Sequence, residues 1–237
     1  MTEVMHDDGV SVVVPVYNGA RHVAAALESI LGQKSTPREI IVVDDGSTDE
    51  TPRVLERCSD RIRTIRQDNR GPSAARNIGI ACATAPLIAF LDADDVWLPE
   101  TLTHHLVAFR GNPAAAIVWG LSNRVIGADA DPPRDDWRGR PQWALSVGSM
   151  LFRRYVFDDA GPFDPSLRIG EDLDLMLRIT EQKIPIVRHT HVVCEKHLHA
   201  GIMSRDGKAA DRARFIVIGK AFERRRVSAP RKTIQSA

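Results

Sequence analysis

The chain has 237 residues, of which 43% are hydrophobic, and its 32 basic and 31 acidic side chains leave a formal net charge of +1. This length and composition fit one globular domain with a full core, and they give no sign of a nucleic-acid-binding protein or a disordered chain. Cys58, Cys82 and Cys194 are widely separated and form no CxxC pair, so we expect neither a disulfide framework nor a zinc site.

The N-terminal sequence and the hydropathy pattern indicate where in the cell the protein is expected. Residues 1–9 include acidic side chains and lack the apolar core of a signal peptide. No segment approaches the roughly 20 apolar residues that a bilayer-spanning helix needs, so we expect a cytoplasmic protein. The basic residues between Arg224 and Lys232 would permit at most a peripheral contact with an anionic membrane surface, and a solvated helix end explains them more simply.

The first half of the chain alternates short β-branched runs with longer amphipathic segments, as in repeated βαβ units around a parallel sheet. Strands are predicted at residues 10–15, 40–43, 61–65 and 86–91. Helices are predicted at residues 20–31, 49–57, 73–83 and from Pro99 to about Arg110. We expect Ser47 or Thr48 to cap the second of these helices.

The second half mixes elements in an α+β fashion. Strands are predicted at residues 115–121 and 148–152, a helix at 171–182, and one or two strands over 184–195, interrupted near His189. The polar stretch 127–142 is predicted to be a mobile loop, and a last helix runs from about Lys208 to Arg226. We expect a single domain with a donor half (about 10–110), an acceptor half (about 111–205) and a C-terminal helix and basic tail (about 206–237).

Polar side chains follow three of the predicted strands at the point where each strand ends. Tyr17 and Asn18 follow the first strand, Asp44 and Asp45 follow the second, and the Asp92–Asp95 segment follows the fourth. In an open parallel sheet, ligands bind beyond the carboxyl ends of the strands, so these residues should meet at one edge. So many acids at one edge are unfavourable unless a cation neutralises them.

The segment Asp92-Ala93-Asp94-Asp95 fits a Mg²⁺ or Mn²⁺ site, because these ions prefer oxygen ligands and share their shell with phosphate oxygens. Such an ion would bridge two phosphates and stabilise a diphosphate leaving group. The alternative is a strand end whose acids are solvated. One of Asp44 and Asp45 would accept hydrogen bonds from a base or a ribose. The structural alternative is that acids from Asp45 to Asp49 cap the next helix, and both can hold because different carboxylates are available.

Three further side chains have a functional and a structural interpretation. Tyr17 would offer a flat face to a base, or it is a rim aromatic. Arg76 would reach a nucleotide or its phosphates, or it is a solvated helix residue. Asp172 would serve as a general base at the start of a helix, or it stabilises the helix dipole.

Taken in order, these segments resemble glycosyltransferase family 2, whose members have the GT-A fold and are inverting enzymes. The motifs that carry the resemblance are VVVPVYN (12–18), IVVDDGSTD (41–49), GPSAARN (71–77), FLDADD (90–95), and GPFD (161–164) leading into EDLD (171–174). The implied fold is an α/β, GT-A type nucleotide-diphospho-sugar transferase fold. It has a central, mostly parallel sheet flanked by helices and a mixed α+β acceptor-side half.

The resemblance also implies roles for individual residues. The nucleotide-sugar would be bound by Pro15 and Tyr17 beside the base, by Asp44 or Asp45, by Arg76, and by Asp92 near the ribose. Asp94 would bind the metal, with Asp95 nearby, and His199 resembles the family histidine that approaches the metal. Asp172 would remove the proton of the acceptor hydroxyl.

The expected activity is transfer of one sugar from a nucleotide-diphosphate donor, with a UDP-sugar favoured. The acceptor would be a saccharide, a lipid-linked saccharide, a peptide or a small metabolite. No Gln-x-x-Arg-Trp motif occurs, which argues against a processive synthase; Pro162 and Met176 depart from the family pattern on the acceptor side. Two alternatives are a non-catalytic nucleotide-sugar-binding homologue and a haloacid-dehalogenase-like phosphatase that uses Asp92 as nucleophile.

Overall fold

The computed structural model describes residues 9–127, 140–198 and 207–228. Within these ranges the strands are β1 (Val10–Val16), β2 (Glu39–Asp44), β3 (Arg63–Arg66), β4 (Leu87–Phe90), β5 (Val96–Trp97), β6 (Ile117–Ile126), β7 (Met150–Arg153) and β8 (Ile186–Leu198). The helices are α1 (Val23–Leu31), α2 (Thr51–Glu56), α3 (Pro72–Cys82), α4 (Thr101–Gly111), α5 (Val156–Asp159), α6 (Glu171–Glu181) and α7 (Gly207–Ser228), with a 3₁₀ turn η1 (Val147–Ser149).

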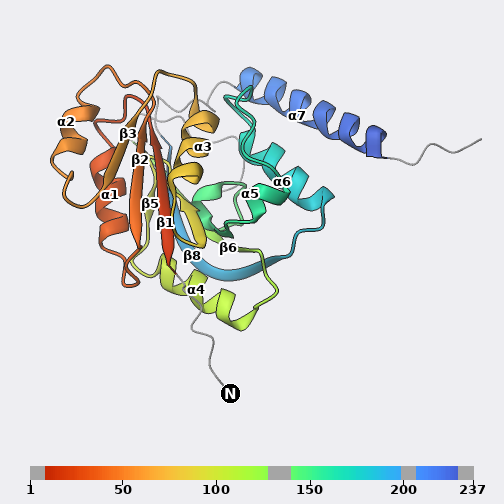
Figure 1. Cartoon of the computed structure of the whole chain (residues 1–237), viewed down its shortest axis with the longest axis horizontal. Coiled ribbons are helices and arrows are strands. Elements are labelled where there is room, and N and C mark those ends of the chain that lie inside the picture. Colours follow the sequence, from red (N-terminus) through yellow and green to blue (C-terminus); the bar gives the residue numbers. More distant parts are fainter. Residues whose placement is uncertain (1–8, 128–139, 199–206, 229–237) are drawn as a thin grey trace, which may run out of the picture.

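The strands form one eight-stranded sheet in the order β3-β2-β1-β4-β7-β6-β8-β5 (Figure 1). Strands β3, β2, β1 and β4 are parallel, as the alternating pattern of the first half predicts. Strand β7 pairs antiparallel with β4 and β6, and β8 pairs parallel with β6 and antiparallel with β5. The predicted α/β class, with a mostly parallel sheet and a mixed second half, is confirmed.

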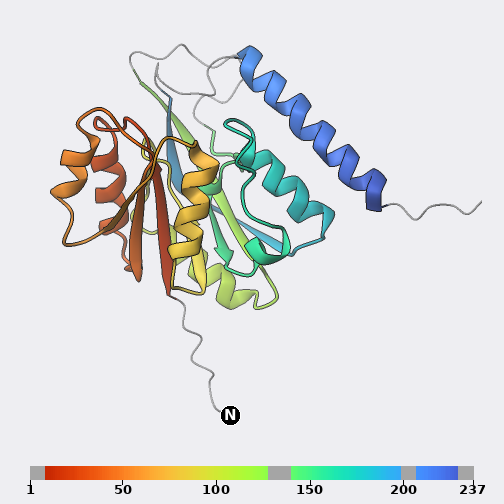
Figure 2. The same ribbon diagram turned by 45° about the horizontal axis from the view of Figure 1, so that its top comes forward.

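Helices cover both faces of the sheet because the side chains of its strands alternate between two cores (Figures 1 and 2). On β1, Val12 and Val14 lie in a core shared with α1, α2 and α4. Val13 lies in the other core, which α3, α5 and α6 cover. The continuous run of β-branched residues in β1 is therefore explained by burial on both faces.

Small residues let α3 approach the sheet closely. A Cβ atom added at Gly79 would lie 2.2 Å from Val13 Cγ1, and Ala75 is fully buried on the same helix. The small residues of this segment thus allow close packing against the sheet. The short distance between α3 and the sheet also brings Arg76 toward the strand ends.

Several predicted elements differ in detail. The predicted cap at Ser47 or Thr48 is wrong: Ser47 Oγ accepts a hydrogen bond from Asn18 N, and Asp49 Oδ1 accepts one from Thr51 N at the start of α2. The predicted interruption near His189 is not a break in the strand: β8 is continuous, and its pairing register with β6 shifts opposite Gly120. The first predicted helix begins later, at Val23. Most of the predicted loop 127–142 lies outside the described residues.

In the described part of the chain, no helix combines the length and the apolar character that crossing a bilayer requires.

Candidate active site

The loops after β1, β2 and β4 meet at one edge of the sheet, as their polar sequences predict. Asp45 N donates to Val16 O at 2.8 Å, and Asn18 N donates to Ser47 Oγ at 2.9 Å, so the first two loops are joined. A Cβ atom added at Gly19 would lie 3.6 Å from Ala93 Cβ, which places the third loop beside the first. The order β2-β1-β4 in the sheet explains this meeting.

Asp44 and Asp45 are both buried and both bonded within the protein. Asp44 accepts hydrogen bonds from Ser47 N at 2.9 Å and from the Arg66 guanidinium. Asp45 accepts from Arg70 N and Gly71 N, each at 2.8 Å, and so fixes the loop that leads into α3. Each carboxylate oxygen can accept more than one hydrogen bond, so Asp44 has lone pairs left beyond these two contacts, although only 1% of its surface is exposed.

Pro15 is buried in β1, and Tyr17 follows it with 51% of its surface exposed. A tyrosine at a strand end that is this exposed is available to stack on a ring. Val16, which precedes Tyr17, pairs with Asp44 at the end of β2, so an aromatic face and carboxylate oxygens lie at neighbouring strand ends. The predicted metal ligand His199 lies outside the described residues.

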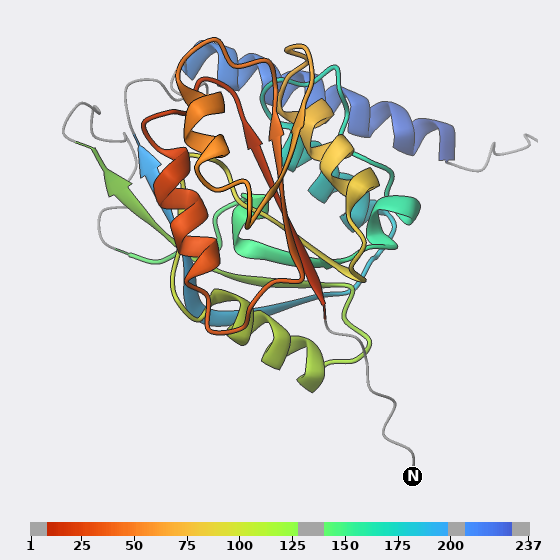
Figure 3. The same cartoon turned by 60° about the vertical axis from the view of Figure 1, so that its left-hand side comes forward.

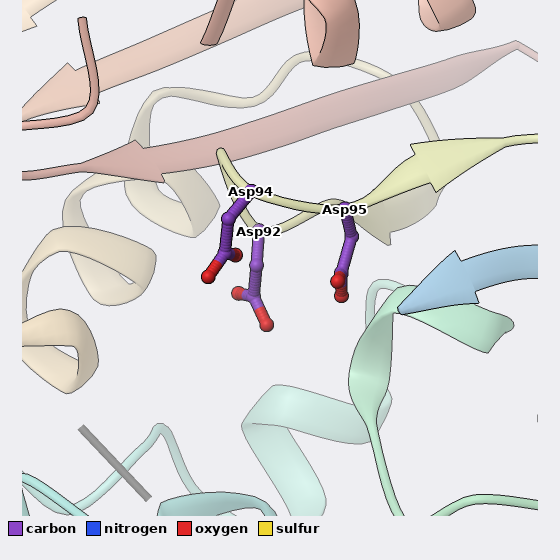
Figure 4. Close-up of side chains that lie close together, drawn as sticks. All are labelled: Asp92, Asp94 and Asp95. Carbon is purple, nitrogen blue, oxygen red and sulfur yellow. The ribbon is translucent and has the colours of Figure 1, made fainter. Parts of the chain in front are cut away.

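The carboxylates of Asp92, Asp94 and Asp95 lie together in the turn between β4 and β5, and each offers an oxygen within 4.8 Å of the others. Figure 4 shows the three side chains on the same side of this turn. Asp95 N donates to Asp92 O at 3.0 Å, which closes the turn. Three clustered carboxylate oxygens are the donor set that a hard divalent cation takes, so the residues present fit such an ion.

Arg76 ties this cluster to the second half of the chain. It is 3% exposed, and its guanidinium donates to Asp92 Oδ1 at 2.6 Å and to Glu171 Oε1 at 2.8 Å. The same guanidinium lies 3.8 Å from Asp172 Oδ1. Although burial disfavours the charge of Asp92, Arg76 and Lys196 lower the pKa of this carboxyl. Arg76 thus holds the end of β4 and the start of α6 at a fixed separation.

Lys196 is a site residue that the sequence did not reveal. Its Nζ lies 2.8 Å from Asp95 Oδ2, 2.9 Å from Ser146 Oγ and 3.7 Å from Asp92 Oδ2. Pairing of Val96 with Glu195 brings the end of β8 to this position. Burial and the neighbouring carboxylates raise the pKa of Asp95 to about 7, although the Lys196 ammonium opposes the shift.

Replacing Lys196 by methionine should leave the buried Asp95 carboxylate without its cation. Breaking a buried ion pair from one side costs about 3–5 kcal/mol, so we expect a loss of this order in the free energy of unfolding at pH 8. The loss should shrink as the pH falls toward 5, because the folded variant then binds a proton on Asp95 that the unfolded chain, with its lower pKa, does not hold.

Urea unfolding at the two pH values measures this effect. The matched control is Lys34→Met, because Lys34 pairs with Glu100 and both side chains are well exposed. Its expected cost is below about 1 kcal/mol at either pH. Equal costs for the two variants would contradict the role given to Lys196.

Asp172 occupies the first turn of α6 and faces the same edge of the sheet. Its Oδ2 accepts a hydrogen bond from Val147 N at 3.2 Å, whereas Oδ1 has no hydrogen-bond partner in the part of the chain that the structure describes. Burial raises the pKa of this carboxyl to about 7, with Glu171 and Asp92 adding to the shift and Arg76 opposing it. A buried carboxylate with this pKa, one of whose oxygens makes no hydrogen bond among the described residues, is suited to accept a proton near neutral pH.

Comparison with known proteins agrees with this geometry. Residues 11–161 match the family described as "Glycosyl transferase family 2". A glycosyltransferase of Nostoc sp. (strain PCC 7120) is 40% identical over 176 residues, covering 66% of this chain and 54% of the relative. The succinoglycan biosynthesis protein ExoO of Rhizobium meliloti is 34% identical over 190 residues, covering 70% of this chain and 54% of the relative. The chain thus spans about half the length of these relatives.

Solved structures share the fold. TarS 1–349 of S. aureus, in complex with UDP-GlcNAc, superposes with a TM-score of 0.70 at 20% identity over 90% of this chain and 66% of that one. The mannosyltransferase PcManGT of Pyrobaculum calidifontis, in complex with GDP-Man and Mn²⁺, gives a TM-score of 0.66 at 22% identity over 93% and 65%. The predicted GT-A type fold is confirmed.

Proposed function

Since the chain belongs to glycosyltransferase family 2, we propose that it moves a single sugar from a nucleotide-diphosphate donor to an acceptor hydroxyl by inverting direct displacement. One observation carries the proposal: a single buried guanidinium, that of Arg76, contacts Asp92 of the carboxylate cluster and approaches Asp172. The diphosphate end of a donor and the base that activates an acceptor would therefore lie a few ångströms apart.

The donor is assigned to the sheet edge where the loops after β1, β2 and β4 meet. Tyr17 and Pro15 would border the base, Asp44 would accept a hydrogen bond from it, and Asp92 would lie near the ribose. Asp45 supports this edge by holding the loop before α3. A UDP-sugar is favoured, and the similar structures of TarS and PcManGT, which hold UDP-GlcNAc and GDP-Man, support a nucleotide-sugar in general.

Asp94 would hold a divalent cation, Mn²⁺ or Mg²⁺, with Asp95 nearby and His199 as a further ligand. When bound, such an ion would offset the charge that develops on the leaving diphosphate. Two cations of the protein also contact the cluster, the buried Arg76 at Asp92 and the partly buried Lys196 at Asp95. These contacts offset part of the charge of the cluster, so a bound ion would not have to neutralise all three carboxylates.

The chemistry assigned to Asp172 is proton removal. The acceptor oxygen would form a bond to the anomeric carbon while its proton passes to Asp172 Oδ1. The bond from the anomeric carbon to the donor phosphate oxygen would break on the opposite face, and the diphosphate would leave with the electron pair. The hydrogen bond from Val147 N to Oδ2 holds the carboxylate in place.

A thermal-shift panel tests the donor assignment. We expect uridine diphosphate with Mn²⁺ to raise the unfolding temperature more than guanosine or thymidine diphosphate, because a bound ligand stabilises the folded state by mass action. Removal of Mn²⁺ by a chelator should abolish most of the shift. No shift with any nucleoside diphosphate would contradict the proposed donor site.

The phosphatase and the non-catalytic binding homologue, the two alternative functions, would each be supported by a different experimental result. The family match gives no support to the phosphatase alternative, in which Asp92 would be a nucleophile; a phosphoenzyme trapped at Asp92 would revive it. A binding homologue without activity would show the thermal shift but would release no nucleoside diphosphate with any acceptor. The position of Asp172, whose buried Oδ1 makes no hydrogen bond among the described residues, favours the enzyme.

A further inference from the structure

Helix α7 has one face against the domain and one face away from it. Its inner face packs through the buried Ala213, Val217 and Ala221, and a Cβ atom added at Gly170 would lie 3.4 Å from Val217 Cγ2. Lys220 pairs with Asp164 on this face. Figures 1 and 2 show α7 along the outside of α6, at the border of the molecule.

The ion pairs at the end of α7 fix its orientation. Arg224 Nη1 lies 3.0 Å from Asp174 Oδ1, and its Nε lies 2.9 Å from Glu181 Oε2. Asp174 is itself buried in α6 and also pairs with Arg178. The rotation of α7 about its axis is therefore set by contacts along its length, and its other face is held outward.

The outward face carries large apolar side chains. Phe215 is 77% exposed and Phe222 is 67% exposed, and Ile216 and Ile218 are nearly half exposed. Residues 215, 218 and 222 follow the helical spacing of one stripe, which we call the outer stripe. Scattered exposed apolar residues are ordinary, but two phenylalanines and Ile218 in one stripe form a patch that marks an interaction surface.

Basic side chains surround the outer stripe. The described helix contains seven basic and two acidic side chains, although the whole chain has a net charge of only +1. Lys208, Arg212 and Arg226 are exposed and lie 180° to 220° from Val217 on a helical wheel, beside the phenylalanines at 140° to 160°. The acidic Asp211 and Glu223 also lie on this outward side, and Asp211 is paired with Arg214. Long basic side chains beside inserted aromatic rings are the pattern of a helix that lies in a membrane interface.

We propose that the outer stripe of α7 binds an anionic membrane surface. A second copy of the chain is a poorer occupant, because two such faces would bring like charges together, which disfavours association. Anionic headgroups instead complement Lys208, Arg212 and Arg226, while Phe215 and Phe222 enter the acyl boundary. Membrane binding by α7 stands independently of the proposed sugar transfer.

Co-sedimentation of the full chain with lipid vesicles tests this inference. We expect binding to vesicles containing phosphatidylglycerol and phosphatidylcholine, weakening as NaCl is raised, and little binding to pure phosphatidylcholine. The double variant Phe215→Ser/Phe222→Ser should bind at least about tenfold more weakly, because its apolar contacts are removed. Both positions are exposed, so its circular dichroism and unfolding temperature should match those of the wild type.

Val107→Ser is the matched control, because Val107 is 59% exposed on α4, at the end of the molecule away from α7 (Figure 3). It should bind vesicles like the wild type. The inference would be overturned by a wild type that ignores anionic vesicles or by a double variant that binds them unchanged. A dimer that light scattering detects in the wild type and not in the double variant would likewise overturn it, in favour of a second copy.

Discussion

Replacing Asp172 by asparagine is expected to lower the rate constant of sugar transfer by a factor of about 10² to 10⁴ and to leave donor affinity unchanged. The amide has nearly the same shape and can keep the hydrogen bond from Val147 N, but it cannot take the proton of the acceptor hydroxyl. Arg76 retains Asp92 and Glu171 as partners in this variant, so the fold should persist.

The pH dependence of the wild type checks the same assignment. The base must be ionised to act, and burial raises the pKa of Asp172 to about 7. We therefore expect kcat/KM to fall about tenfold for each pH unit below that value and to level off above it. Asp158→Asn is a control, since Asp158 is an exposed acid on α5 in the same half of the chain. Transfer by Asp172→Asn at near wild-type rate would exclude Asp172 as the base.

Replacing Asp94 by asparagine is expected to abolish the gain in donor affinity that Mn²⁺ provides. Asp94 lies in the turn with Asp92 and Asp95, each offers a carboxylate oxygen within 4.8 Å of the others, and Asp94 is assigned to the ion. Such an ion is usually held by only one or two protein carboxylates. Removing one of them should therefore lower metal-dependent donor affinity by at least about tenfold.

Calorimetric titration of UDP in the presence and absence of Mn²⁺ measures this loss. Asp94→Asn with Mn²⁺ should behave like the wild type without it. The control Asp60→Asn removes an exposed carboxylate after α2 and should bind as the wild type does. If Asp94→Asn retains the full effect of Mn²⁺, the metal assignment is wrong.

Much of the donor half was predictable from the sequence because its signals are local. The β-branched runs of β1, β2 and β4 and the small-residue face of α3 specify buried strands and close packing within a few residues. The start of α6 was predicted at its observed position, since acids in a first turn favour a helix N-terminus. Strand β5 and helix α5 were missed because two and four residues carry too little periodicity.

The parts of the site that escaped prediction depend on long-range pairing. Lys196 reaches Asp95 only because β8 pairs with β5, which no local pattern encodes. Arg76 was predicted to reach a nucleotide. Its partner Glu171 lies 95 residues away in the sequence, and helical spacing predicts only contacts within one helix. The nucleotide role of Arg76 stays a prediction, and its carboxylate contacts are an addition.

A crystal structure with Mn²⁺ and uridine diphosphate tests the central claim most directly, because it shows where the donor's diphosphate lies. The expected result is an ion bound by Asp94 and the phosphate oxygens, with the base beside Tyr17 and Asp44. Asp172 Oδ1 should lie across the site from the phosphates. A diphosphate bound away from the turn between β4 and β5, or an ion without contact to Asp94, would contradict the account.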